Sequence, residues 1–78
     1  MREVGVAFRL ARSGMLIIKV QNEPMPGQML FDSRKRPVGR VTEVFGPVKS
    51  PYASARPVSD LVKQVLGEKV YSRDEGRK

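Results

Sequence analysis

The stretch Val38-Gly-Arg-Val-Thr-Glu-Val-Phe-Gly-Pro-Val48, followed directly by Lys49-Ser-Pro-Tyr52, decides how this chain folds. It predicts a strand that ends at a rigid corner and reverses into a second strand, with an aromatic residue on each side of the corner. Apolar and polar residues do not alternate strictly in the first strand. In a regular strand, the apolar residues Val41 and Val44 would point to opposite faces. Such mixing indicates a bent strand or a bulge near Gly39, as expected where a small sheet closes into a barrel.

Two prolines hold the corner. Pro47 fixes its own backbone and lacks an amide donor, so the hydrogen-bond ladder of the sheet must stop or reach an edge there, and Pro51 has the same effect four residues later. Gly46 supplies conformational freedom just before the rigid residue. A connection fixed at both ends loses little entropy on binding, which favours association with a partner. We expect Gly46 to Val48 to make the main contact, Tyr52 to lie at an interface and Phe45 to be buried.

The rest of the chain also predicts strands. Alternation over residues 4–10 indicates a half-buried strand with four inward residues: Val4, Val6, Phe8 and Leu10. A turn at residues 12–14 leads to a strand over 15–20, whose inward residues are Leu16, Ile18 and Val20. After a proline-containing loop, we expect a short strand over 28–32 with Met29 and Phe31 inward, and a closing strand over 68–72.

Residues 58–66 change to the period of a helix. The apolar positions form one stripe, made of Val58, Leu61, Val62, Val65 and Leu66. Ser59 or Asp60 can cap the start of this helix, and Gly67 can end it. We expect a short α-helix that covers the barrel, because so small a domain cannot spare that much apolar surface for binding.

The composition limits the function. A chain of 78 residues has room for one domain, and we expect a barrel over 1–73 followed by a polar tail over 74–78. It contains no Cys and no His, so thiolate nucleophiles, imidazole bases and the usual zinc ligands are excluded. Its carboxylates are scattered, and the only adjacent pair, Asp74-Glu75, falls in the tail, where no burial would raise a pKa for acid-base catalysis. We expect no enzyme activity, no cofactor, no metal and no small-molecule substrate.

The chain is strongly basic. Fifteen Lys and Arg against eight Asp and Glu give a net charge of +7, which favours polyanionic neighbours such as RNA. The cluster Arg34, Lys35 and Arg36 predicts either a solvated turn or a nonspecific RNA contact. With few aromatic residues, we expect RNA contact only through charge, and therefore sensitive to salt. No apolar run approaches the ~20 residues that span a bilayer, so we expect a soluble intracellular protein.

Several features together resemble a known family. The strand over 38–48, Pro51-Tyr52 after it, an extended segment ending at Asp32 before it, and Gly67-Glu-Lys-Val-Tyr71 resemble the small glycine-arginine-rich-protein subunit of box H/ACA ribonucleoproteins. The resemblance covers roughly residues 4–72 and is most specific at the corner. It implies a closed six-stranded β-barrel of the reductase, isomerase and elongation-factor type.

The resemblance also implies a role. In that particle a guide RNA directs pseudouridine formation during rRNA processing, and this subunit is not the catalyst. It docks on the pseudouridine synthase subunit and influences a mobile loop that loads and releases substrate RNA. Guide RNA and the other H/ACA proteins would then be partners through the complex. By position, the docking residues would be Val44, Phe45, Gly46, Pro47, Val48, Pro51 and Tyr52.

Arg-Gly-rich tails, which eukaryotic members carry, are not found in this sequence, so it resembles the compact archaeal form. We expect a cytoplasmic location in an archaeal cell, and a nucleolar one only in a eukaryote.

Two other functions stay open. Short barrels of the ribosome-maturation type, with a similar Val-Gly-x-Val strand, bind ribosomal proteins as adaptors. A free-standing RNA-binding barrel would need a coherent basic face with stacked aromatics, and the scarcity of aromatic residues disfavours it.

Overall fold

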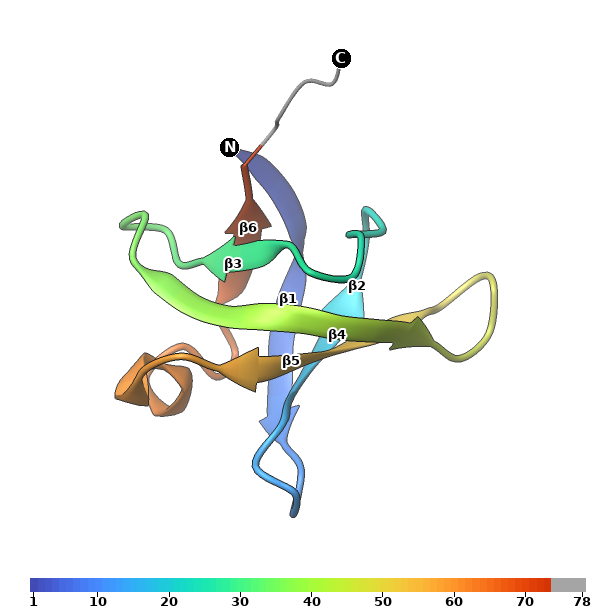
Figure 1. Cartoon of the computed structure of the whole chain (residues 1–78). Coiled ribbons are helices and arrows are strands. Elements are labelled where there is room, and N and C mark those ends of the chain that lie inside the picture. Colours follow the sequence, from blue (N-terminus) through green and yellow to red (C-terminus); the bar gives the residue numbers. More distant parts are fainter. Residues whose placement is uncertain (74–78) are drawn as a thin grey trace.

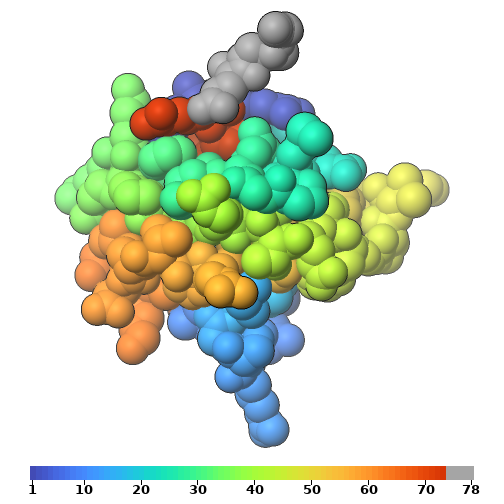
Figure 2. All heavy atoms as spheres, in the orientation of Figure 1, coloured from blue at the N-terminus to red at the C-terminus, as the bar shows by residue number. Residues whose placement is uncertain are grey.

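The stretch that begins at Val38 forms most of strand β4 (Pro37–Phe45), the loop after it and the start of strand β5 (Tyr52–Pro57). The two strands pair antiparallel, and Phe45 lies opposite Tyr52 at the corner. Figure 1, a computed structural model, shows the loop between them extending away from the barrel, and Figure 2 shows it as a protrusion. The structure describes residues 1–73, so the tail expected over 74–78 lies outside the described residues.

The other strands are β1 (Arg2–Leu10), β2 (Leu16–Val20), β3 (Met29–Phe31) and β6 (Lys69–Ser72). All neighbours pair antiparallel, and the strands close in the order β1-β2-β5-β4-β3-β6. The expectation of an all-β, six-stranded closed barrel is confirmed. Within the described residues, no helix is long and apolar enough to cross a membrane.

Among residues 1–73, the core cluster of the barrel consists of aliphatic and small side chains. These residues are Val4, Ala7, Leu16, Ile18, Leu30, Val38, Val41, Ala53, Ala55, Val62, Val65 and Val70. Strand β2 behaves as predicted, because Leu16 and Ile18 are fully buried and Val20 packs against them. The aromatic residues are therefore on the wall of the barrel or outside it.

Bulges in β4 explain its mixed faces. The register against β3 shifts at Val38, which confirms the bulge expected near Gly39, and the register against β5 shifts at Thr42. Because a bulge reverses the alternation that follows it, Val41 and Val44 both turn toward the core. A bulge of this kind bends the strand so that the sheet can close.

The second bulge also overturns one expectation. Phe45 follows Val44 and so points outward, where it is 40% exposed. Its predicted burial was wrong, because the extra residue at Thr42 moves Phe45 to the outer face.

Strand β1 has two bulges as well. Its register shifts at Val4 against β6 and at Phe8 against β2, so the core receives Val4 and Ala7. Phe8 is the extra residue of the second bulge and is 46% exposed. The predicted inward face of β1 was therefore wrong for Phe8, and Val6 is only half-buried.

The inward residue of β3 also differs from the prediction. Leu30, fully buried, is the residue of β3 that reaches the core, and it lies opposite Gly39 of β4. Met29 and Phe31 flank it and line a surface groove. Phe31 is buried as expected, at 8% exposure, but it is not part of the core cluster, and Met29 is half-buried. The short strand alternates as expected but with the opposite phase, because its partners fix which residue faces inward.

The segment between β5 and β6 is not an α-helix. It contains one turn of 3-10 helix, η1 (Asp60–Lys63), with Ser59 accepting a hydrogen bond from the Leu61 amide. Val62 and Val65 enter the core, whereas Val58 and Leu66 are 46% and 40% exposed. A three-residue spacing suits a 3-10 turn, and so short a connector cannot offset the cost of nucleating an isolated α-helix.

Candidate docking surface

A strip of aromatic side chains lies on the outside of the barrel. The rings of Phe8 and Tyr52 are stacked, with centroids 6.2 Å apart and planes 8° apart. Phe45 adds a third ring, 6.0 Å from Tyr52 and tilted by 50°. The Lys19 ammonium lies 4.3 Å from the centre of the Phe8 ring, in a cation–π contact. We call these four residues the aromatic strip.

Strand pairing brings the strip together. Tyr52 lies opposite Phe45 of β4 on one side and opposite Lys19 of β2 on the other. The bulge at Phe8 adds a ring from β1, so the strip crosses four neighbouring strands, β1, β2, β5 and β4. Phe8 and Phe45 are exposed and Tyr52 is half-buried, so the strip leaves aromatic surface in contact with water, a feature typical of protein interfaces.

The loop after β4 extends the apolar surface. Gly46 has φ +97°, a conformation that L side chains rarely adopt, and the Ser50 amide donates to the Pro47 carbonyl at 3.2 Å. The Pro51 carbonyl accepts from the Val20 amide at 3.1 Å, which ties the base of the loop to β2. At the tip, Val48 is 96% exposed. The loop is thus built to present an aliphatic side chain to water.

Most of the residues predicted for docking lie on this surface. Phe45 and Tyr52 belong to the strip, and Gly46, Pro47, Val48 and Pro51 form the adjoining loop. Val44 is the exception, because it packs against the core and faces away from the strip.

Phe8 and Lys19 were missed by sequence reasoning. No local signal marks Phe8, because its outward position depends on a bulge set by β2. Lys19 alternates with the inward residues of β2, so its outward position could have been inferred, but not its contact with Phe8.

The basic turn, expected to be either solvated or in nonspecific contact with RNA, is organised by the carboxylate of Asp32. Asp32 is buried, and its Oδ1 accepts from the amides of Arg34 and Arg36 at 2.9 and 2.8 Å. Its Oδ2 accepts from Nε of Arg36 at 2.7 Å. Burial alone would raise the pKa of Asp32, but the Arg36 amide and guanidinium and the Arg34 amide together hold that pKa below its ordinary value.

One consequence concerns RNA contact. The Arg36 guanidinium is committed to Asp32, whereas Arg34 and Lys35 are exposed. Lys35 adopts the left-handed conformation at φ 66°, in the middle of the turn. The turn therefore presents fewer uncommitted charges to a phosphate backbone than its sequence suggests. Over residues 1–73, no three acidic side chains gather in a group able to hold a metal ion.

A closed barrel with exposed aromatic rings and a stiff adjoining loop has the features of a protein that binds a partner through its surface. The sequence model of the Gar1/Naf1 RNA binding region matches residues 2–76, and the chain belongs to this family. The family consists of non-catalytic accessory proteins of box H/ACA ribonucleoproteins, so the resemblance noted in the sequence is confirmed.

A relative is found in Methanothermobacter thermautotrophicus. This chain is 28% identical to an uncharacterized protein of that organism over 57 residues, which are 73% of this chain. The aligned part spans 62% of the relative's length.

Proposed function

We propose that this protein is the accessory barrel that docks on the pseudouridine synthase subunit of an H/ACA ribonucleoprotein and supports RNA-guided pseudouridine formation. Family membership supports the type of particle. The observation that supports the docking role is the exposed surface formed by the rings of the aromatic strip and the adjoining loop, which has Val48 at its tip.

The strip and the loop suit tight binding to a partner that carries the catalytic residues itself. The stacked rings of Phe8 and Tyr52 are preorganised, and the loop is closed by a hydrogen bond between Ser50 and Pro47. Groups that are ordered before binding lose little entropy when the partner arrives. In this proposal the barrel acts on catalysis through its partner's mobile loop, without contributing a reacting group.

Co-purification with the synthase subunit tests the proposal. Tyr52→Ala removes the central ring of the strip and should raise Kd at least about tenfold, as for a buried aromatic anchor. Gly46→Glu should abolish binding, because it adds a charge beside the loop and also strains a backbone position that has a positive φ. Undiminished binding by both variants would sink the proposal.

Two variants that carry the same substitution distinguish a loss of binding at the loop from a general effect of the added charge on folding. Val48→Glu places a carboxylate on the loop tip, at a residue that makes no contact with the core, and should prevent docking. Val58→Glu makes the same change at another exposed valine, outside the strip, and should bind like the unmodified protein. Equal loss of binding in both variants would show that the loop is not the docking site.

A further inference from the structure

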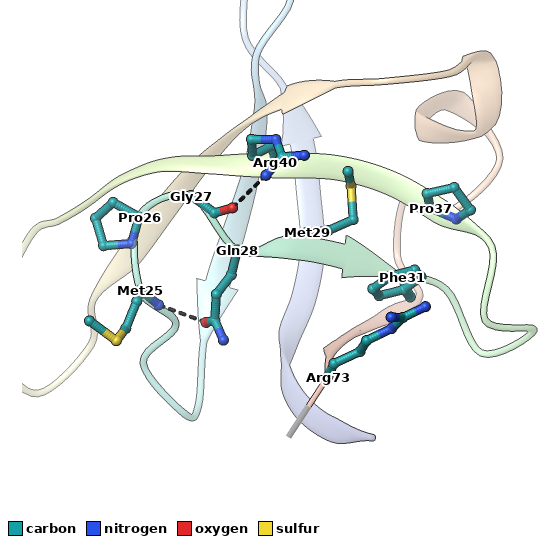
Figure 3. A pocket seen from close by; sticks show the side chains of 9 residues that line it. All are labelled: Met25, Pro26, Gly27, Gln28, Met29, Phe31, Pro37, Arg40 and Arg73. Atoms are coloured by element: carbon teal, nitrogen blue, oxygen red, sulfur yellow. Dashed lines mark hydrogen bonds between the residues drawn. The ribbon is translucent and has the colours of Figure 1, made fainter. Parts of the chain in front are cut away.

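A second surface lies away from the docking strip. In the order of the closed barrel, β3 and β6 stand opposite β2 and β5, which carry the centre of the strip. A groove of about 750 Å³ runs over β3, between the loop before it, β4 and the end of β6 (Figure 3). The groove has an apolar floor and two arginines, and among its lining residues there is no carboxylate.

The first feature of this groove is a flat cation held over an aromatic ring. The centre of the Arg73 guanidinium lies 5.2 Å from the centre of the Phe31 ring. Phe31 is almost covered at 8% exposure, whereas Arg73 is exposed. A guanidinium supported from beneath by a ring can present its outer face as a platform for a nucleobase.

The second feature is a pair of polar groups fixed by the backbone. Nη1 of Arg40 donates to the Gly27 carbonyl at 2.7 Å, which holds this guanidinium along the groove wall. Oε1 of Gln28 accepts a hydrogen bond from the Met25 amide at 2.8 Å. The side-chain NH₂ of Gln28 takes no part in that bond and can donate to a ligand. A fixed cation and an amide donor suit a phosphate and the polar edge of a base.

We propose that this groove binds a short segment of single-stranded RNA, with one base stacked on Arg73 and a phosphate paired with Arg40. The positive lining favours a polyanion over an apolar protein segment. The guanidinium platform favours a base over phosphate alone. The site is independent of docking on the synthase. Base stacking in this groove departs from the expectation, drawn from the scarcity of aromatic residues, that RNA is contacted only through charge.

Fluorescence anisotropy with an unstructured RNA of about eight nucleotides tests this site. Arg73→Lys keeps the charge but removes the planar platform, and should weaken RNA binding about tenfold. The same variant should bind inorganic polyphosphate, which has charge but no bases, as tightly as the unmodified protein. The salt dependence should be unchanged, because the number of cations is unchanged.

Arg12→Lys, the same change in the exposed turn between β1 and β2, is the matched control and should leave both affinities unaltered. Equal affinities of the Arg73 and Arg12 variants for RNA would overturn the proposal, as would equal weakening of RNA and polyphosphate. Tighter binding of a glutamate-rich peptide with one tryptophan than of the RNA would assign the groove to a protein instead. None of these assays contains the synthase, so they test the RNA site independently of the proposed docking.

Discussion

Asp32 holds the turn between β3 and β4 by accepting hydrogen bonds from two amides and one guanidinium. Asp32→Asn removes the charge that these bonds use and leaves Arg36 without its ion pair. We expect the free energy of unfolding to fall by about 1–3 kcal/mol, as measured by chemical denaturation.

The same residue predicts a pH dependence. The pKa of Asp32 is held below its ordinary value in the folded protein, so the unfolded chain takes up a proton first as pH falls. The stabilisation by Asp32 is complete above the unfolded pKa of about 3.9 and is lost as pH falls through the folded pKa. The stability difference between the unmodified protein and Asp32→Asn should therefore shrink below about pH 4. A difference that stayed constant to lower pH would contradict this assignment.

Gly5 allows β1 and β2 to approach closely. A Cβ at this position would collide with the carbonyl oxygen of Lys19. Gly5→Ala should therefore force the strands apart and lower the free energy of unfolding by about 1–3 kcal/mol. Arg9→Ala, an exposed position on the same strand, should change it by less than about 0.5 kcal/mol. Similar thermal melting of the two variants would show that β1 accommodates the extra methyl group.

At the scale of the strand, alternation predicts the inward face only where no residue is inserted. Leu16 and Ile18 of β2 were placed correctly, because β2 has no inserted residue: the extra residue in its pairing with β1 is Phe8 of β1, and its pairing with β5 has no shift. Phe8 was placed on the wrong face, because a bulge depends on the register of the partner strand and not on the local sequence. Phe45 was misplaced for the same reason.

The sequence predicted the part of the candidate site that comes from one continuous segment of the chain. Pro47 and Pro51 mark the corner in the sequence, and the structure has its loop there. Phe8 joins the strip from a strand far away in the chain, so only the closed barrel brings it beside Tyr52. Likewise, only the structure shows that Asp32 holds the basic turn through hydrogen bonds to Arg34 and Arg36.

The connector between β5 and β6 divides its apolar residues between core and solvent. Val62→Ala removes buried methyl groups and should lower the free energy of unfolding by about 1–3 kcal/mol. Val58→Ala changes an exposed valine of the same segment and should cost less than about 0.5 kcal/mol. Equal costs in urea denaturation would mean that the whole predicted stripe packs on the barrel.

At the scale of the molecule, the barrel separates two surfaces by their chemistry. The aromatic strip consists of three rings and one ammonium and lies over β1, β2, β5 and the end of β4. The groove over β3 carries arginines and lies on the opposite strands. A net charge of +7 favours polyanions such as RNA, and in our proposal the strip makes the specific contact with a protein.

Capture from cell extract compares the docking proposal with the ribosomal alternative in one experiment. The unmodified protein and its Val48→Glu variant serve as bait at equal concentration, and the retained proteins are identified by mass spectrometry. We expect a pseudouridine synthase to be retained by the unmodified protein and lost from the variant. Retention of ribosomal proteins in place of the synthase, or of the synthase equally by both baits, would contradict docking through this surface.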